Sequence, residues 1–515
     1  MTFNNVMRYD FGRPSRQPPS RVPIPMQRLS HARPARVAFT WNGHAIEGRE
    51  GDTVGAALHA ASITTLGRSR KHHRPIGLSG SFVSGSLATV DTRPNVRLDR
   101  EPLAAGLTVR MQNTWPSADL NLLSLARLLP ARMTYAGFEH TNLMPSGTRR
   151  FEVWEKLLRF MAGVADAPSA PNERTAPKGA RVAVDTVVVA GGPAGRIAAS
   201  AAAQRGERVM LISRGSTPGE SAARMVGSLP ELDHRVETRG GLEAFGIYRD
   251  GAFVAAAPLD GRVGALVIAP KKIVLATGRR SCPPLMPGAD LPGVMDAATA
   301  LSLAVDCAVA PGMQVAVIGT GAEIEVARRL RDLGVHVVAT APTQSLRRIT
   351  GHNAVTGIET DRLITCDALV HAGPWRPDPA LAFMAGCDGL LQLRDAPHLS
   401  GVSLAGGAGD AAEPIILGPG PRDAAFVCPC MDVTVAEILH HVRRGETDVE
   451  VLKRLTACGM GPCQGVPCWD QLAALLAEEV GGAPADYGHP TYRGPRRGLT
   501  VAQAAGLDGL VEPDR

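Results

Sequence analysis

The hydrophobic pattern alternates between short continuous apolar runs, typical of buried strands, and stretches with apolar residues three or four positions apart, typical of helices. Two segments, 184–212 and 314–340, each pass from an apolar strand through a glycine-rich turn into a helix and a second strand. Such β-turn-α-β units build parallel sheets covered by helices. The pattern therefore predicts a multidomain α/β protein with two Rossmann-like halves.

The N-terminal part predicts a β-hairpin followed by a helix. Residues 37–46 form two strand-like stretches around Asn42-Gly43, a dipeptide typical of a two-residue hairpin turn. Apolar residues at helical spacing over 54–61 follow Asp52, the expected N-cap. Residues 1–35 are rich in Arg and Pro and lack an apolar segment, so we expect a disordered arm rather than a signal peptide.

Two helical patterns near the C-terminus lie between two cysteine-containing loops. The first begins at Thr434, where Glu437 completes a capping box, and the second repeats this signal at Thr447 and Glu450. Two antiparallel helices would bring the loop before the first helix back against the loop after the second. Four cysteines then converge: Cys428, Cys430, Cys463 and Cys468.

Four converging thiolates are the ligand set of an iron–sulfur cluster or of a structural zinc ion, and a disulfide or an empty site is the remaining alternative. The turns at 459–462 and 464–465 contain glycines, whose bare backbone N–H groups suit the sulfurs of an anionic cluster. Cys458 is a fifth thiol nearby, which we expect to be a small buried residue. The scattered cysteines are expected in hydrophobic cores: Cys282, Cys307, Cys366 and Cys387.

Length and charge narrow the class of protein. A chain of 515 residues is too long for one core and predicts three or four domains. Its formal net charge of +6 is small for this length and gives no reason to expect nucleic-acid binding. No run of eighteen apolar residues exists, which argues against a membrane span. The clustered thiols fit a reducing, cytoplasmic compartment.

The first glycine-rich turn predicts a dinucleotide site. Its glycines would let the backbone approach a pyrophosphate at the start of the following helix. Two positions depart from the fingerprint: Ala190 replaces the first glycine, and Ser213 stands where an acid would bind the ribose. The turn consists of Ala190, Gly191, Gly192, Pro193, Ala194 and Gly195.

Two later stretches resemble flavoproteins with two dinucleotide-binding domains. Residues 273–278, which end in Thr277 and Gly278, resemble their strand-and-turn signature, and residues 404–410 resemble their late Gly-Asp motif. The resemblance implies FAD in this domain, with the Asp410 carboxylate facing the ribityl and phosphate region. In the second β-turn-α-β unit, Ile324 fills the place of the third glycine and would crowd the helix against the strand, and Thr340 offers no ribose carboxylate. We therefore expect a Rossmann-like fold there without NAD(P).

The cysteine spacing, with 32 residues between Cys430 and Cys463, resembles the bacterioferritin-associated-ferredoxin type of [2Fe-2S] domain. That resemblance implies a [2Fe-2S] cluster held by Cys428, Cys430, Cys463 and Cys468, and it does not need Cys458.

The N-terminal hairpin and helix, together with Gly67–Pro75 and Arg93–Arg97, resemble the ferredoxin-like domain at the head of sarcosine oxidase α subunits. Plant-type ferredoxins carry their cluster cysteines in the loop that corresponds to Leu78–Ser86. That loop has no cysteine here, and the first cysteine of the chain is Cys282. We therefore expect a β-grasp domain that holds no cluster and serves in packing or partner binding.

The order of segments resembles the α-type subunits of heteromeric flavin dehydrogenases: sarcosine oxidase, opine oxidase, hydrogen cyanide synthase and hydroxyproline dehydrogenase. The resemblance implies a hetero-oligomer in which an FAD-containing β subunit oxidises a C–N bond and this chain accepts the electrons. The expected segments are a disordered arm (1–35), a ferredoxin-like domain (36–113), a connecting segment (114–180), an FAD-binding domain (181–300 and 375–425), a second Rossmann-like domain (301–374), a helical [2Fe-2S] domain (426–483) and a tail (484–515).

No nucleophile-base pair or catalytic metal motif is evident, so we expect no catalytic residue in this chain. The histidine pairs 72–73 and 440–441 are expected to be solvated surface residues. Two other functions stay open. One is a degenerate scaffold that binds a cluster but no flavin, and the other is a self-sufficient NAD(P)H-dependent flavoprotein reductase.

Overall fold

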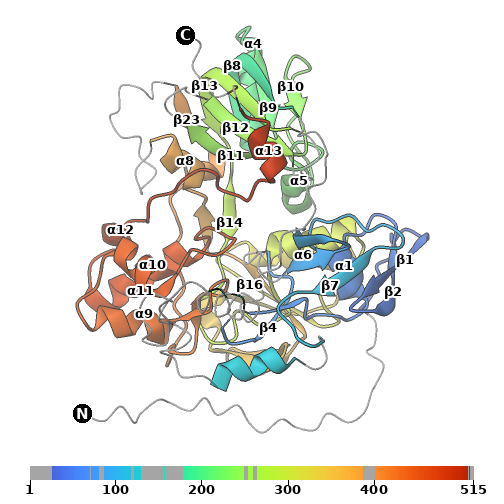
Figure 1. Ribbon diagram of the computed structural model, residues 1–515, viewed down its shortest axis with the longest axis vertical. Helices are drawn as coiled ribbons and strands as arrows, with labels where there is room; N and C mark the ends of the chain where they lie inside the picture. Colours follow the sequence, from blue (N-terminus) through green and yellow to red (C-terminus); the bar gives the residue numbers. More distant parts are fainter. Residues whose placement is uncertain are drawn as a thin grey trace.

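The structure is a computed structural model that describes residues 26–69, 71–80, 86–117, 121–128, 152, 156, 178–248, 253–258, 264–386, 401–508 and 510. A sheet built on β8 (Ala180–Val189) and β13 (Leu266–Leu275) forms one end of the molecule (Figure 1). The N-terminal strands and the C-terminal helices lie on opposite sides of the other end. The short strand β14 (Arg279–Ser281) runs between the two ends (Figure 1).

The N-terminal domain is a mixed five-stranded sheet with the order β2-β1-β7-β5-β6. The predicted hairpin is present, because β1 (Arg36–Trp41) and β2 (His44–Arg49) pair antiparallel. Helix α1 (Val54–Ala60) packs against them, and its N-cap is Thr53 rather than the predicted Asp52. The other elements are β3 (Gly67–Arg68), β4 (Pro75–Ile76), β5 (Leu87–Val90), β6 (Arg93–Arg97), β7 (Thr108–Met111) and η2 (Leu122–Leu128).

The last part of the expected N-terminal arm is ordered. Met26 and Leu29 are buried in the core that the N-terminal domain shares with the second parallel sheet, and the Leu29 N–H donates to Ala308 O at 2.9 Å. Arg28 forms an ion pair with the buried Asp52 carboxylate at 2.7 Å. The prediction of disorder is therefore wrong for residues 26–35, and residues 1–25 lie outside the described residues.

The sheet built on β8 and β13, which we call the upper sheet, has the strand order β10-β9-β8-β13-β12-β11. Strand β23 also pairs with β13. Strand β9 and the last three residues of both β8 and β13 are continuous apolar runs, as expected of strands buried on both faces. Helix α4 (Pro193–Gln204) packs on this sheet through Ala199, Ala202 and Ala203. The other elements here are β9 (Val209–Ile212), α5 (Glu220–Val226), β10 (Glu237–Arg239), β11 (Leu242–Tyr248), β12 (Phe253–Pro258), α8 (Ala380–Met384), β23 (Val402–Leu404) and η6 (Gly406–Ala408).

The second parallel sheet has the order β15-β21-β16-β17, and a three-stranded antiparallel sheet, β18-β19-β20, accompanies it. The strand β14 pairs with β22 (Trp375–Pro377) in a two-stranded ribbon that leads to and from the upper sheet. The elements are β15 (Val294–Asp296), α6 (Ala297–Asp306), β16 (Val315–Gly319), α7 (Glu323–Asp332), β17 (Val337–Pro342), η5 (Thr343–Ser345), β18 (Arg348–Gly351), β19 (Val355–Glu359), β20 (Leu363–Thr365) and β21 (Ala368–Ala372).

The C-terminal domain is helical, with the small ribbon β24 (Phe426–Cys428) and β25 (Val433–Thr434) at its start. The predicted capping box of Thr434 and Glu437 begins α9 (Val435–Val442). Helix α10 (Val449–Thr456) is capped by Asp448, one residue after the predicted Thr447. Helix α11 (Cys468–Val480) follows, then α12 (Pro484–Tyr487) and α13 (Val501–Ala505). Part of the tail packs against the upper sheet, through Leu499 and Leu507.

Candidate functional site

The C-terminal cysteines lie together in one small core between β24 and the helices α9, α10 and α11. Cys428 ends β24, and Cys468 is the first residue of α11. Cys430, Cys458 and Cys463 lie on the connecting loops. Cys463 is partly exposed, and the other four are buried. The structure therefore brings the four predicted ligands together and adds Cys458 to the group.

The thiols of this group contact one another. Cys428 hydrogen-bonds with Cys458 and Cys468, and Cys463 hydrogen-bonds with Cys430 and Cys468. Hydrogen bonds from Cys458 and Cys468 hold the pKa of Cys428 well below its usual value, and the same contacts raise the pKa of Cys458 and Cys468. Cys458 is as buried as Cys428, Cys430 and Cys468, so burial does not separate it from these three predicted ligands.

The glycine turn before Cys463 fits a thiolate-bound cluster. The Gly459 N–H points to Cys428 Sγ at 3.4 Å, and the backbone of Met431 also donates to this sulfur. A Cβ on Gly461 would lie 2.5 Å from the Cys430 Cβ, so the turn needs glycine to approach the cysteine loop. In the described part of the chain, no group of three or more His, Cys, Asp or Glu side chains is arranged to hold a single metal ion.

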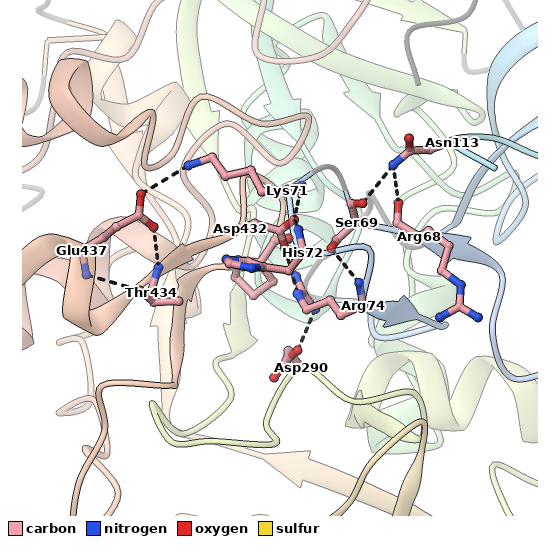
Figure 2. Close-up of polar contacts among 11 residues, drawn as sticks. Arg68, Ser69, Lys71, His72, Arg74, Asn113, Asp290, Asp432, Thr434 and Glu437 are labelled. Atoms are coloured by element: carbon pink, nitrogen blue, oxygen red, sulfur yellow. Dashed lines mark hydrogen bonds and ion pairs between the residues drawn. The ribbon is translucent and has the colours of Figure 1, made fainter. Parts of the chain in front are cut away.

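A buried carboxylate next to the cysteines receives a loop of the N-terminal domain. Asp432 has no exposed surface and lies two residues after Cys430. Its Oδ2 accepts the backbone N–H of Lys71 at 2.8 Å and of His72 at 3.2 Å (Figure 2). The docking loop, residues 68–74 as far as they are described, therefore wraps around a side chain of the cysteine domain.

The Arg74 guanidinium lies at the centre of this contact (Figure 2). Its Nε donates to Asp432 Oδ1 at 2.8 Å, and its Nη1 donates to Asp290 Oδ2 at 2.7 Å. Its Nη2 donates to the carbonyl of Pro429, between Cys428 and Cys430, at 2.5 Å. The guanidinium also lies 4.2 Å from the centre of the Phe426 ring, a cation–π contact.

This network holds a positive charge in a buried position. Burial disfavours the charge, but Asp290 and Asp432 raise the pKa of Arg74. Burial likewise disfavours the Asp432 carboxylate, but Arg74 lowers the pKa of Asp432 below its usual value. Sequence reasoning missed both residues. The available signals were an aspartate two positions after the Cys-x-Cys loop and a run of basic residues in a domain without cysteines.

Two further contacts of the docking loop involve other side chains of the C-terminal domain. Lys71 Nζ forms an ion pair with Glu437 of α9 at 3.3 Å, and the His72 ring packs edge-on against Phe426. His73 is only 5% exposed. The prediction of solvated histidines is wrong for His73, because the docking loop is buried against another domain. On α9, His440 is exposed.

The predicted flavin residues meet at the start of α4. Gly192 is the N-cap and Pro193 the first residue of this helix, so no side chain caps its first N–H groups. A Cβ on Gly195 would lie 2.1 Å from Ala190 O, and one on Gly406 would lie 2.5 Å from the Ala194 Cβ. Backbone this close, with free N–H groups, is suited to binding a pyrophosphate.

The turn after β13 and the late Gly-Asp motif complete this region. Thr277 and Gly278 join β13 to β14, and Gly278 has a φ of +72°. Asp410 follows η6, which packs on α4, and its Oδ2 lies 3.6 Å from Arg279 Nε. The structure thus places the three flavin motifs around one helix N-terminus.

Ala190 and Ser213, the two positions that depart from the dinucleotide fingerprint, differ in backbone conformation and burial. Ala190 has a φ of +83°, a conformation that favours glycine. Ser213 is buried at the end of β9, and its N–H donates to Arg239 O at 3.0 Å. The end of β9 therefore carries a buried serine where the fingerprint has an acid. Gly191 packs against Pro218, where an added Cβ would lie 2.6 Å from the Pro218 Cβ.

The second nucleotide-type turn carries its own anion. Glu323 begins α7 and is 8% exposed, and its Oε2 accepts the Gly321 N–H at 2.7 Å. A carboxylate thus lies at the helix N-terminus where a nucleotide phosphate would bind, and it would repel the phosphate. The predicted reason against NAD(P) is wrong in its detail, because Ile324 is 70% exposed and does not crowd the strand.

The predicted flavin motifs and the group of C-terminal cysteines lie near the two ends of the short strand β14. β14 begins directly after Gly278, and two residues after its end the Pro283 carbonyl accepts the Gln471 side chain of α11 at 3.0 Å. Beside it, Arg376 of the paired strand β22 bonds Asp470 of α11 at 2.6 Å. The first turn of α11, which starts at Cys468, is thus fixed to the ribbon that leads from the flavin region.

Two family profiles match the chain. The profile of a 2Fe-2S iron-sulfur cluster binding domain matches residues 34–114, and the profile of the sarcosine oxidase A3 domain matches residues 422–507. The predicted placement is corrected by these matches: the 2Fe-2S family domain is N-terminal, and the segment 426–483 belongs to an A3-type domain. Residues 34–114 contain no cysteine, so the matched domain supplies no thiol.

Curated relatives support the same relationship. The chain is 29% identical to the alpha chain of sarcosine oxidase from Rhizobium meliloti over 89% of its own length and 56% of that protein. It is 37% identical to the A component of opine oxidase from the same organism over 18% of its length and 20% of that protein. The chain therefore spans about half the length of the first relative.

Among solved structures, L-proline dehydrogenase from P. horikoshii is similar over 92% of this chain and 99% of that one, with a TM-score of 0.68 and 22% identity. This similarity confirms the mixed α/β multidomain fold. Together, the comparisons confirm the predicted resemblance to α-type oxidase subunits. No helix among the described residues is long and apolar enough to cross a membrane.

Proposed function

We propose that this chain is the electron-accepting subunit of a heteromeric flavin-dependent dehydrogenase or oxidase that acts on the C–N bond of a small amine, amino acid or opine. The relatives named above support this class, because their names describe one subunit of a sarcosine oxidase and one subunit of an opine oxidase. A partner subunit with its own FAD would bind the substrate.

The observation that carries the proposal is the ribbon of β14 and β22. It joins the Gly278 turn, beside the predicted flavin motifs, to the first turn of α11, where Cys468 lies. Two redox groups placed at these positions would be held at a fixed separation by paired backbone and by the Arg376–Asp470 ion pair. Electron transfer between a flavin and a cluster needs a fixed distance between them. A scaffold without flavin has no such need.

The residues present fit the two groups. A flavin supplies two-electron acceptance and one-electron release, and a [2Fe-2S] cluster supplies one-electron transfer. The N–H groups at the start of α4 would hold the flavin's pyrophosphate, and Asp410 would face its ribityl region. The thiol ligands can come only from outside residues 34–114, because the first cysteine is Cys282. We assign them to Cys428, Cys430, Cys463 and Cys468.

Assembly and location follow from the same proposal. The chain would act within a hetero-oligomer, with a β subunit of amino-acid-oxidase type as its electron donor. A cytoplasmic location fits a site of five closely spaced free thiols, because such thiols persist in a reducing compartment.

The test is the cofactor content of the chain purified without oxygen, alone and with its β subunit. Iron, acid-labile sulfide and acid-released flavin are assayed on one sample, and the visible spectrum is recorded. We expect one cluster and one FAD per chain. A cluster without flavin would favour the scaffold alternative, and bleaching of the flavin by NADPH alone would favour the self-sufficient reductase.

A further inference from the structure

The docking loop connects two domains that differ in their capacity to hold metal. The N-terminal domain matches a 2Fe-2S family profile but contains no cysteine, whereas the C-terminal domain holds five. Contacts between them concentrate on Asp432, next to the Cys428–Cys430 loop. The domain without thiols is thus fixed against the domain that has them, at the cysteines themselves.

The Arg74 side chain is the part of this loop that bonds the backbone between Cys428 and Cys430. Its Nη2 donates to the Pro429 carbonyl, and both neighbours of Pro429 are predicted ligands. The Arg74 side chain is 11% exposed, and that of Asp432 is not exposed. Little water is therefore present to screen the charge, and buried charges act over longer distances than surface charges.

The contacts of the docking loop allow an effect of the Arg74 charge on the cysteine site to be distinguished from a purely structural role of the loop. Lys71, on the same loop, bonds Glu437 on α9 instead of the cysteine loop, and it contributes docking contacts of the same kind. Asp290 bonds Arg74 from the opposite side to Asp432 and adds a negative charge next to it. The three side chains can therefore be changed independently.

We infer that Arg74 raises the reduction potential of a cluster bound by the C-terminal cysteines. This inference rests on the proposed function. Reduction adds one negative charge to the cluster, and a fixed cation beside its ligand loop stabilises the reduced form. Net charge and hydrogen bonds around the sulfurs are principal determinants of such potentials. The N-terminal domain would thus act on the electron transfer of a cluster that it does not itself bind.

The experiment compares the cluster's midpoint potential in the full chain and its variants by a redox titration followed by EPR and absorbance. One unit charge about 10 Å away at an effective dielectric constant of about 20 changes an equilibrium constant about tenfold. For Arg74→Met we expect the ratio of reduced to oxidised cluster to fall about tenfold at the wild-type midpoint, which corresponds to about 59 mV for one electron. Arg74→Lys retains the charge and should keep the ratio within about threefold of wild type.

Lys71→Met is the matched control, since it removes a cation of the same loop whose ammonium group bonds Glu437 of α9 and not the backbone between the cysteines. It should change the ratio less than twofold, although it loosens the same interface. If Arg74→Met does not retain its cluster, Asp290→Asn provides the test, because removing a negative charge beside Arg74 should increase the reduced fraction at least threefold.

Equal shifts in Arg74→Met and Lys71→Met, or no shift in Asp290→Asn, would overturn the inference and leave the loop a structural clamp. The assays also separate this failure from a failure of the proposed function. Wild-type chain without iron and sulfide would refute the cluster itself, whereas a loaded chain with unchanged potentials would refute only the role of Arg74.

Discussion

Acidification should weaken the second nucleotide-type half through a single buried histidine. His371 lies in β21 with 1% exposure, and its Nδ1 is 2.6 Å from Ser281 Oγ of β14. Burial lowers the pKa of His371 from 6.5 to about 3. Between these values the unfolded chain binds a proton that the folded chain does not. The stabilisation is therefore complete above pH 6.5 and decreases as the pH falls toward 3.

The size of the effect follows from the interval in pH. At pH 5 the unfolded histidine has been titrated through about 1.5 pH units, which corresponds to about 2 kcal/mol of lost unfolding free energy. The variant His371→Gln has a side chain of similar size that does not titrate. Ser281 keeps its contacts with the backbone of His371 and Gly373 in this variant, so no buried hydroxyl is left without a partner.

Urea unfolding of both proteins at pH 7.5 and pH 5, followed by tryptophan fluorescence, measures this difference. The wild type should lose about 2 kcal/mol more than His371→Gln between the two pH values. Other histidines titrate in both proteins and cancel in the comparison. Parallel losses in the two proteins would refute the assignment of a neutral, desolvated His371.

Four further variants test the two candidate sites. Cys463→Ser should abolish the cluster's absorbance and iron content, whereas Cys458→Ser should leave both intact; loss in the Cys458 variant alone would reverse this choice of ligands. Gly461→Ala should lower iron content at least severalfold, because its methyl group would press on the Cys430 Cβ; normal loading would show that the turn can move. Ala190→Gly relieves a φ of +83° and should raise the free energy of unfolding by up to about 1 kcal/mol in urea titrations, and a decrease would contradict that strain.

Local signals in the sequence predicted local structure well. The capping box of Thr434 and Glu437, the hairpin at Asn42-Gly43 and the glycine turn at α4 each depend on residues within a few positions of one another. The convergence of the cysteines was predictable because two short helices between two loops leave little choice of path. The ligand set and the flavin contacts stay predictions.

Long-range contacts were beyond such reasoning. Nothing near Asp432 in the chain indicates that Arg74 will bind it, and nothing near Met26 indicates a shared core with the second sheet. Glu323 illustrates a subtler limit. Sequence comparison drew attention to Ile324, a missing glycine, while the charge that opposes a phosphate lies one residue earlier and acts through its burial.

The contact between Arg74 and Asp432 also has a consequence for folding during synthesis, because it can form only after both residues have been made. Its two residues are 358 positions apart, and at 5–20 residues per second the ribosome needs about 20–70 s to pass from one to the other. Within that interval Arg74 can bond Asp290, once that residue has been made, but not Asp432. The loop can therefore close beside the Cys428–Cys430 loop only after Asp432 has been made, so these two thiols remain open on this side until then.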